Sequence, residues 1–377
     1  MLVFNELIAQ AVNLHASDIH FTVGIPPTVR IDGELHHLGD IRCTPAEIEE
    51  MALSIMGEHH KETLKNNGEV DFAYSIPGEG RYRINVFRQR GTLAVAVRIL
   101  NLNIPSPEEL GLPKALVNMC QKKRGLVLVT GPTGAGKSTT LASLIDVINQ
   151  TSKQHIITLE DPIEYLHRHN KSIVNQREMG FDSQNYASAL RAALREDPDV
   201  LLVGEMRDLE TISTAITAAE TGHLVLSTLH TNDAPSTIDR LLDMGVESFL
   251  ISSALKGIIS QRLVRRICPN CRTEYTPTAE EQQMLRLPVT PGRKFYRGKG
   301  CPMCFNTGYR GRTAVFEILS LTGPIKHAIA DNAPHSQLMK LIEESDFEPL
   351  IVDCIRLVQN GTTTVEEAYR TVNSTDL

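Results

Sequence analysis

The 377-residue chain contains no tryptophan, and aromatic residues make up only 5% of it. Proteins that bind single-stranded nucleic acid stack the bases on aromatic side chains, and this chain offers few of them. The net charge of −7 points the same way, because surfaces that bind nucleic acid are generally basic. We therefore expect no nucleic-acid partner, although a local basic groove stays compatible with the composition.

Long apolar runs are also missing. No stretch approaches the roughly 18 apolar residues that a membrane helix needs, and residues 1–6 show neither the basic segment nor the apolar core of a signal peptide. A cytoplasmic protein is therefore expected. Because thiols stay reduced in the cytosol, an ordered pattern among the seven cysteines indicates a metal site or catalysis rather than disulfides.

The remaining composition is typical of a folded protein, with 41% hydrophobic and 22% charged residues, and the length predicts two to three domains. Residues 4–14 carry apolar side chains at helical spacing, and residues 81–88 and 93–100 have the pattern of two strands in a hairpin. We predict a small α+β domain over residues 1–100 and a proline-containing linker over 101–113.

The pattern changes from residue 124 onwards. Apolar runs of strand length alternate with helical stretches, which predicts a parallel sheet with helices on both faces. The predicted strands cover 126–129, 156–159, 200–203 and 224–227, and the predicted helices cover 137–148, 186–195 and 209–219.

The segment GPTGAGKS at residues 131–138 matches the phosphate-binding pattern G-x-x-x-x-G-K-[ST]. A predicted strand enters it and a predicted helix leaves it, so that backbone N–H groups and the helix N-terminus can face phosphate oxygens. Lys137 would reach the β- and γ-phosphates of ATP, and Ser138 would help to hold Mg²⁺. The predicted nucleotide-binding residues of this loop are Gly131, Pro132, Thr133, Gly134, Ala135, Gly136, Lys137, Ser138 and Thr139.

Two apolar strands run into carboxylates. Residues 200–203 lead to Glu205, in the form of a Walker B element, and residues 156–159 lead to Glu160, Asp161 and Glu164. The carboxyl ends of strands line the ligand crevice in open α/β sheets, so both clusters are expected to face the nucleotide and its Mg²⁺. The alternative is that they are solvated loop acids. Since Glu205 replaces the commoner aspartate, its contact with Mg²⁺ can run through water.

Two histidines, His223 and His230, flank the predicted strand over 224–227. A single histidine is more often structural than functional. Here one stands at each end of a strand in the nucleotide-binding domain, with hydroxyl groups nearby. We interpret both as residues that sense phosphate or couple motion.

Four cysteines form a C-x₂-C pair, a spacer of 29 residues and a second C-x₂-C pair: Cys268, Cys271, Cys301 and Cys304. Four thiolates close the tetrahedral shell of one ion, which predicts a structural Zn²⁺ with no position left for catalysis. The spacer exceeds the usual length for a zinc ribbon, and a helix over 278–285 is expected within it. The alternative is four unligated thiols. The other three cysteines, Cys43, Cys120 and Cys354, are scattered and expected to be buried.

Together these features resemble one family closely, the secretion ATPases of type II secretion and type IV pilus systems. The matching stretches are GPTGAGKSTT (131–140), ITLEDPIEY (157–165), ALREDPDVLLVGEMRDLET (193–211) and TGHLVLSTLHTNDA (221–234), and the resemblance extends from ASDIHF (16–21) to VEEAYRT (365–371). It implies a hexameric, ring-shaped, cytosolic ATPase, peripheral to the inner membrane. Its motion would drive pilin-like subunits through an inner-membrane platform protein.

The resemblance also assigns roles by position. Glu164 would activate the attacking water, Glu205 would hold the metal site, and His223 and His230 would be the histidines of the histidine box. Arginines typically complete the nucleotide site of a neighbouring subunit, because a guanidinium can pair with two phosphate oxygens. The candidates for that role are Arg81, Arg83, Arg88, Arg98, Arg191 and Arg195. For each of them, a surface salt bridge is the alternative.

The expected fold class is α/β. A RecA-like P-loop domain (114–265) follows the smaller α+β domain, which is expected to be PAS-like. A zinc-binding insertion (266–312) and a helical C-terminal region (313–377) come after it.

The direction of the motor is read from two conflicting signals. The cysteine tetrad and the tail DCIRLVQNGTTTVEEAYR (353–370) are typical of assembly and secretion ATPases. The overall length and the stretches over 16–35 and 203–211 are more like retraction ATPases. Assembly or secretion is the preferred interpretation and retraction is the alternative, while a nucleic-acid translocase or a catalytically idle nucleotide-binding regulator fits less well.

Overall fold

The computed structural model describes residues 3–14, 16–31, 33–76, 80–100 and 103–373. The chain divides into two compact units, Met1–Asn103 and Ile104–Leu377. The division falls inside the predicted linker over 101–113, of which residues 101 and 102 lie outside the described part. The same segment also contains a short helix, α4 (Pro107–Leu110), because Ser106 and Glu109 form a capping box at its start.

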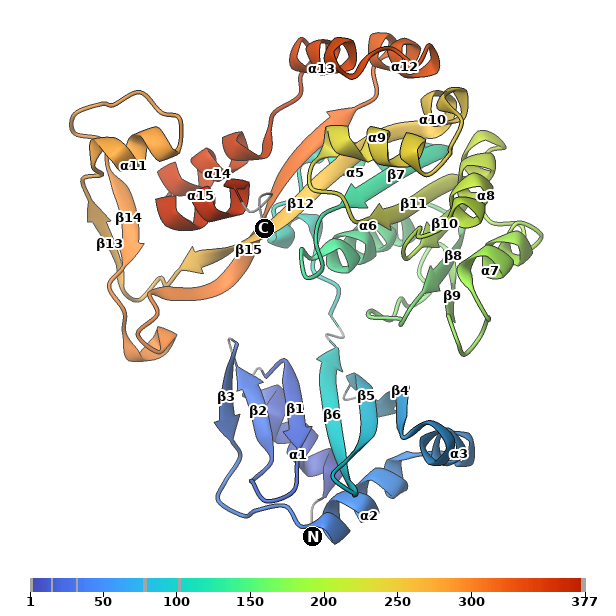
Figure 1. The fold of residues 1–377 in the computed structure, drawn as a ribbon, viewed down its shortest axis with the longest axis vertical. Coiled ribbons are helices and arrows are strands. Elements are labelled where there is room, and N and C mark those ends of the chain that lie inside the picture. Colours follow the sequence, from blue (N-terminus) through green and yellow to red (C-terminus); the bar gives the residue numbers. More distant parts are fainter. Residues whose placement is uncertain (1–2, 15, 32, 77–79, 101–102, 374–377) are drawn as a thin grey trace. The chain divides into compact units, whose positions relative to one another are not determined.

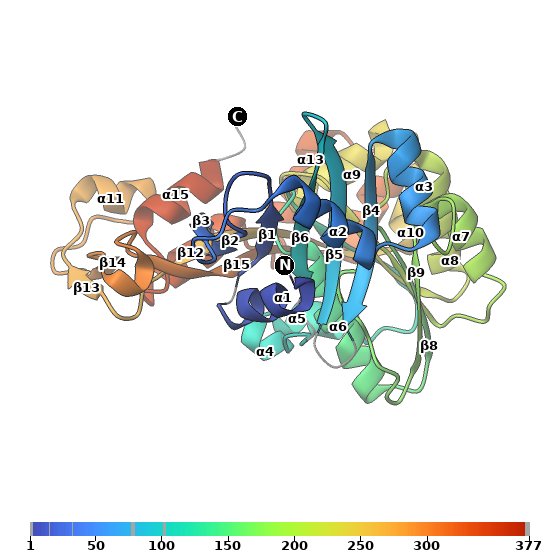
Figure 2. The same cartoon turned by 90° about the horizontal axis from the view of Figure 1, so that it is seen from below.

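The first unit is one antiparallel sheet with helices packed on it (Figure 2). The sheet order is β3-β2-β1-β6-β5-β4. Its elements are α1 (Phe4–Asn13), β1 (Asp18–Phe21), β2 (Thr28–Ile31), β3 (Glu34–His37), α2 (Pro45–Ile55), α3 (Glu58–Asn67), β4 (Glu69–Ile76), β5 (Gly80–Gln89) and β6 (Thr92–Leu100). The hairpin expected over 81–100 is confirmed as β5 and β6. The likeness of this α+β unit to PAS domains stays a prediction.

The second unit contains a seven-stranded mixed sheet in the order β15-β12-β7-β11-β10-β8-β9 (Figure 1). Its strands are β7 (Gly125–Thr130), β8 (His155–Glu160), β9 (Ile173–Glu178), β10 (Val200–Val203), β11 (Leu224–Leu229), β12 (Leu255–Ile267) and β15 (Tyr309–Ser320). Neighbouring strands are parallel except for β12 and β15. The parallel sheet expected from the strands between residues 126 and 227 is confirmed for β7, β8, β10 and β11. The chain also returns after the cysteine segment and pairs β15 antiparallel to β12, which the sequence had not predicted.

Helices cover both faces of this sheet, which explains why every residue of β7, β10 and β11 is buried. One face packs against α5 (Lys114–Met119) and α6 (Lys137–Thr151). The other packs against α7 (Tyr186–Ala193), α8 (Leu209–Glu220), α9 (Ala234–Asp243) and α10 (Ser248–Ala254). Helices α7, α8 and α9 are each preceded by an N-cap residue: Asn185, Asp208 and Asp233. The side chain of each accepts a hydrogen bond from a backbone N–H group of the first turn.

Strands β12 and β15 extend beyond the sheet as a long ribbon that carries the cysteine segment (Figure 1). This segment contains β13 (Arg272–Tyr275), α11 (Ala279–Met284), β14 (Phe295–Gly298) and a 3₁₀ turn over Pro302–Cys304. The domain boundaries expected at 265/266 and 312/313 therefore fall inside two paired strands. The cysteine segment is an insertion between β12 and β15.

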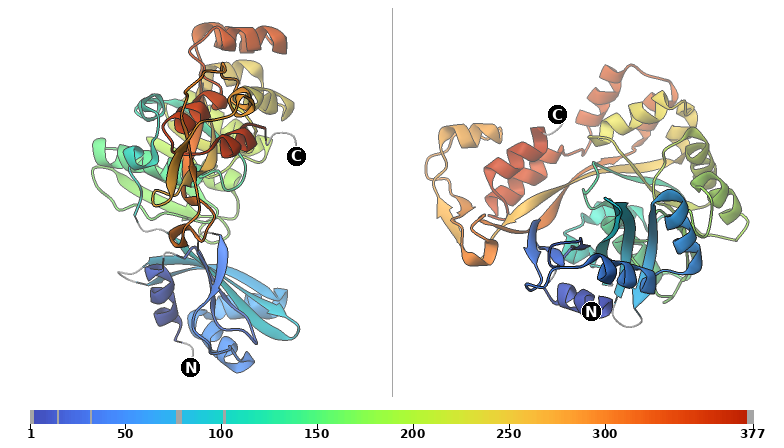
Figure 3. Two further views of the ribbon diagram at one scale, coloured as in Figure 1. Left: turned by 90° about the vertical axis from the view of Figure 1, so that its left-hand side faces the viewer. Right: turned by 60° about the horizontal axis from the view of Figure 1, so that its bottom comes forward.

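The chain continues as α12 (Gly323–Ala330), α13 (His335–Glu343), α14 (Leu350–Gln359) and α15 (Val365–Asn373), and residues 374–377 lie outside the described part. Helices α14 and α15 lie side by side and pack against β15 and β12 (Figure 3). Among the described residues, no helix has the length and apolar character needed to cross a bilayer.

Candidate active site

Four parallel strands end at one edge of the seven-stranded sheet, and a predicted site residue follows or ends each of them. The phosphate loop follows β7, Glu160 is the last residue of β8, Glu205 comes just after β10, and His230 comes just after β11. Because neighbouring parallel strands present their carboxyl ends together, the sheet brings these segments to one crevice.

The phosphate loop bends sharply and packs closely against strand β12. Gly131 and Gly136 have φ angles of +138° and +86°, which favour glycine. A side chain at Gly131 would also collide with the strand, because its Cβ would lie 2.3 Å from the carbonyl oxygen of Gln261. Helix α6 then begins at Lys137, so its N-terminal N–H groups belong to the loop.

Lys137 folds back over its own loop. Its Nζ donates hydrogen bonds to the carbonyl oxygens of Gly131 (2.7 Å) and Pro132 (3.0 Å), and the side chain is almost fully buried. Burial lowers the pKa of Lys137, and the charges of Glu205 and Glu164 oppose that change. The ammonium group thus lies within electrostatic reach of both carboxylates that were predicted to be catalytic.

The two carboxylate oxygens of Glu205 face the side chains of Arg207 and His230. Arg207 places Nη2 2.6 Å from Oε1, and His230 places Nε2 3.6 Å from Oε2. The structure therefore brings Glu205 and His230 together. It also adds Arg207, a residue of the quoted motif VGEMRDLET to which the sequence had assigned no role.

Glu160 and Glu164 lie in different environments although they belong to the same motif. Glu160 accepts hydrogen bonds from Thr158 Oγ1 (2.6 Å) and Gln176 Nε2 (3.1 Å), and burial raises the pKa of its carboxyl group to about 7. Glu164 is exposed, and so is Asp161. Glu160 is thus held by its neighbours, whereas Glu164 is accessible to a water molecule.

Replacing Glu160 by glutamine is expected to change how stability depends on pH in the nucleotide-free protein. The folded chain holds a proton on Glu160 that the unfolded chain releases near pH 4.5, so the resulting stability is lost as the pH rises from about 4.5 through 7. Glutamine does not titrate. The unfolding temperature of Glu160→Gln relative to the parent should therefore rise between about pH 5 and pH 8, equivalent to roughly 1–3 kcal/mol. A difference that stays constant over this range would contradict the raised pKa.

Several hydroxyl groups of the crevice make contacts that the sequence did not predict, although Thr139 itself was a predicted nucleotide-binding residue. The hydroxyl groups of Thr139 and Tyr165 are hydrogen-bonded at 2.9 Å, which ties the start of α6 to the segment after β8. Burial raises the pKa of Tyr186, and the charges of Asp161 and Glu205 add to this effect. The bond between Thr139 and Tyr165 joins residues that are 26 positions apart, so only the folded chain reveals it.

The remaining predicted site residues lie in the following surroundings. His223 precedes β11 and thus stands at the opposite end of that strand from the phosphate loop, where its Nδ1 lies 2.9 Å from the carbonyl oxygen of Ala218. On the nucleotide domain, Arg191 pairs with Glu210, and Arg195 is exposed. In the first unit, the Nε atoms of Arg83 and Arg98 lie 3.5 and 3.0 Å from carboxylate oxygens of Asp71 and Asp18.

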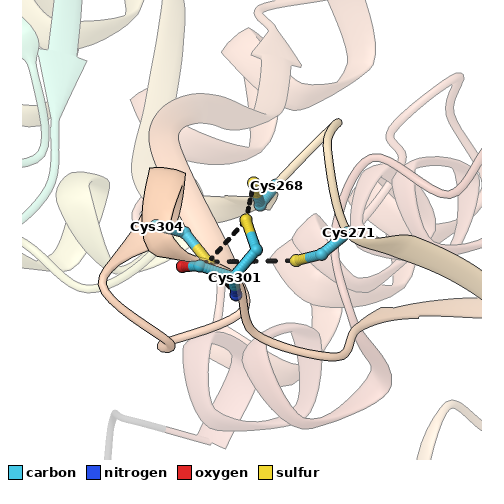
Figure 4. Close-up of side chains that lie close together, drawn as sticks. All are labelled: Cys268, Cys271, Cys301 and Cys304. Carbon is cyan, nitrogen blue, oxygen red and sulfur yellow. Dashed lines mark hydrogen bonds between the residues drawn. The ribbon is translucent and has the colours of Figure 1, made fainter.

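The four clustered cysteines converge within the inserted segment (Figure 4). All their sulfur atoms lie within 4.8 Å of one another, and three pairs are 3.7–3.8 Å apart. A disulfide has an S–S distance of about 2.05 Å, so these are free thiols. A hydrogen bond from the Asn270 amide lowers the pKa of Cys301 to about 6, which favours the thiolate that a metal needs. This group could hold a metal ion.

Comparison with known proteins decides the family. Residues 1–370 match the family described as type II/IV secretion system protein. The chain belongs to this family. It is accordingly an ATPase, and the identification made from the four sequence motifs is confirmed.

Similar proteins come from both branches of the family. The type IV pilus retraction ATPase PilT of Pseudomonas aeruginosa is 43% identical over 268 residues, covering 70% of this chain and 78% of PilT. The putative type II secretion system protein E of Escherichia coli is 38% identical over 396 residues, covering 98% of this chain and 76% of that protein. A crystal structure of the pilus retraction motor PilT with bound ADP superposes with a TM-score of 0.82 at 44% identity, covering 98% of this chain and 97% of PilT.

Proposed function

We propose that this chain is a hexameric motor ATPase that hydrolyses ATP to drive the assembly or secretion of pilin-like subunits through an inner-membrane platform protein. The observation that carries the proposal is the convergence of the phosphate loop with Glu164 and Glu205 at one edge of the sheet. Among the described residues, no helix is long and apolar enough to cross a membrane. We place the proposed motor on the cytoplasmic side, peripheral to the inner membrane, because the resemblance to secretion ATPases implies that location.

In this proposal the residues of the loop, Gly131 to Thr139, bind the phosphates of ATP. Lys137 leaves the carbonyl oxygens of Gly131 and Pro132 and turns to the β- and γ-phosphates. Ser138, exposed on the first turn of α6, and Glu205 are oxygen donors of the kind that Mg²⁺ prefers. When bound, Mg²⁺ would neutralise charge on the phosphates. Glu205 would then give up its ion pair with Arg207 and take part in the Mg²⁺ site.

Glu164 is proposed to orient and deprotonate the attacking water. The carboxylate of Glu164 is exposed at the crevice. Glu160 accepts hydrogen bonds from Thr158 and Gln176, and it interacts electrostatically with Glu164. Asp161, exposed between them, and His230, beside Glu205, complete the polar lining. His223, at the far end of β11, would act on the nucleotide only through movement of that strand.

Arginines are proposed to complete the site of a neighbouring subunit in the ring. Arg83 and Arg98 already pair with carboxylates. Each could exchange its carboxylate for a phosphate without a further desolvation penalty for the guanidinium. The remaining candidates for this role are Arg81, Arg88, Arg191 and Arg195.

The cysteine cluster is proposed to bind one structural Zn²⁺. Four sulfurs placed 2.3 Å from a zinc ion in a tetrahedron are about 3.8 Å apart, which is the spacing of the closest pairs here. Backbone N–H groups of Cys301 and Gly308 point at the Cys304 sulfur from 3.3 Å. Such donors stabilise thiolate ligands and orient them.

The comparisons fit both directions, and we prefer assembly or secretion because the cysteine tetrad and the tail over residues 353–370 are typical of those motors. Type II secretion proteins E align with 97–98% of the chain. The sequence alignment with PilT covers 70% of it. Retraction is the second candidate, because the PilT structure matches nearly the whole chain at 44% identity.

Deletion of the gene distinguishes the two directions. An assembly or secretion motor should leave cells without surface pili or with exoproteins retained in the periplasm. A retraction motor should leave cells with excess pili that no longer shorten. Complementation with the parent gene should restore the wild type, whereas complementation with Lys137→Ala should not. Normal pili, secretion and pilus dynamics in the deletion strain would contradict both.

A further inference from the structure

Strand β12 places a buried amide directly behind the phosphate loop. Ser260 lies opposite Thr130 in the parallel pairing of β12 and β7, so Gln261 comes next to the first glycine of the loop. Gln261 is only 1% exposed. Its Nε2 donates to the carbonyl oxygen of Ala135 (2.7 Å), and its Oε1 accepts from the Thr140 hydroxyl (2.8 Å). One amide thus joins the loop to the helix that the loop enters.

We propose that Gln261 is a positioning residue that holds the phosphate loop in its nucleotide-binding shape from the side away from the nucleotide. The inference rests on the nucleotide site described above. Gln261 does not contact the phosphates, and its effect runs through the carbonyl of Ala135 and the hydroxyl of Thr140.

In the proposed function, Lys137 exchanges the carbonyl oxygens of its own loop for phosphate. The hydrogen bonds of Gln261 should therefore matter most when nucleotide is bound. Without nucleotide, the Lys137 ammonium binds the carbonyl oxygens of Gly131 and Pro132 and so helps to keep the loop curled. When the ammonium turns to phosphate, those two bonds are lost. The bond from Gln261 to Ala135 does not involve Lys137 and can persist. Removal of Gln261 should therefore penalise the bound state more than the free state.

Contacts on the opposite face of β12 hold Gln261 in place. Ser260 and Arg262, the neighbours of Gln261, both donate to the carbonyl oxygen of Asn232, at 3.3 and 3.0 Å. Strand β12 is also paired on both sides, with β7 and with β15. The amide of Gln261 is thus presented by a rigid element. Close packing adds to this, because a Cβ at Gly136 would lie 3.0 Å from Nε2.

The test replaces Gln261 by methionine, which has a similar shape but cannot form either hydrogen bond. Leaving the Ala135 carbonyl unpaired in the bound state should raise the Kd of a fluorescent ATP analogue and the KM for ATP about tenfold, with kcat changed by less than about threefold. Thr140→Val should have a smaller effect in the same direction, and Thr140→Ser, which keeps the hydroxyl, should restore parental affinity.

Asn149→Leu is the matched control. Asn149 is equally buried and donates to the carbonyl oxygen of Arg168 at 2.7 Å, near the other end of α6. This variant should lower the unfolding temperature while leaving the Kd and KM at parental values. If Gln261→Met behaves like Asn149→Leu, the positioning role is refuted. If Gln261→Met fails to fold, parental affinity in Thr140→Val overturns the proposal. A parent chain that binds no nucleotide would instead refute the site itself.

Discussion

Replacing Glu164 by glutamine is expected to reduce kcat for ATP hydrolysis by at least about 100-fold, with little change in the affinity for ATP. Glutamine has the same shape but cannot accept a proton from the attacking water. The phosphate loop and Lys137, which are proposed to bind the nucleotide, are untouched. Steady-state hydrolysis at saturating ATP and binding of a fluorescent ATP analogue, measured on the same preparation, check both halves of the prediction.

Glu247→Gln provides the control for this change. Glu247 is an exposed carboxylate just before α10, outside the crevice, so its replacement makes the same chemical change without touching the proposed water position. This variant should hydrolyse ATP at the parental rate. The assignment fails if Glu164→Gln keeps more than about a tenth of the parental kcat, or if its loss is recovered by raising Mg²⁺, because Glu164 would then be acting on the metal.

The structure explains why Glu164, rather than Glu160, is the candidate general base. Glu160 ends β8 and Glu164 follows that strand, and both are acidic residues of one motif. Glu160 already accepts hydrogen bonds from Thr158 and Gln176, which fix it in the wall of the crevice. A base needs a carboxylate that is accessible and can approach a water molecule. Glu164 is exposed, so it meets this requirement.

The sequence predicted the parts of the site that depend on local order along the chain. A strand, a glycine-rich loop and a helix follow each other directly along the chain, and the structure has them as β7, the phosphate loop and α6 over residues 125–151. Carboxylates at strand ends are likewise readable, because parallel strands put those ends together. What could not be read is any contact made across the sheet. The partners of Gln261 are 126 and 121 residues away in sequence.

Strand direction also separates two residues that the sequence treated alike. His223 and His230 flank one strand with hydroxyl groups near both, and no local pattern ranks them. In the parallel sheet only the carboxyl end of β11 meets the phosphate loop, which brings His230 to Glu205 and leaves His223 at the other end. The sequence also did not predict that β15 pairs antiparallel to β12. The alternation of strands and helices ends before the cysteines, so it gives no information on the strand that follows them.

Replacing Cys301 by alanine is expected to abolish binding at the proposed zinc site and to destabilise the inserted segment. The parent should contain about one Zn²⁺ per chain by elemental analysis, and the variant should contain about none, because three thiolates leave the shell open. The unfolding temperature of the second unit should fall. Turns and the short strand pair β13–β14 bring Cys268, Cys271 and Cys304 together. Few buried apolar residues lie in this segment, so little else would stabilise it without the metal.

Cys120→Ala separates metal loss from the loss of a cysteine. Cys120 is buried beside α5, remote from the cluster in sequence and absent from the metal-binding group. Its removal should leave the zinc content at the parental level. A chelator should lower the unfolding temperature of the parent and of Cys120→Ala but not of Cys301→Ala, and ATP binding should persist in all three, because the phosphate loop belongs to β7 and α6. A parent that is free of zinc yet equally stable with and without chelator would show that the four thiols hold their geometry without an ion.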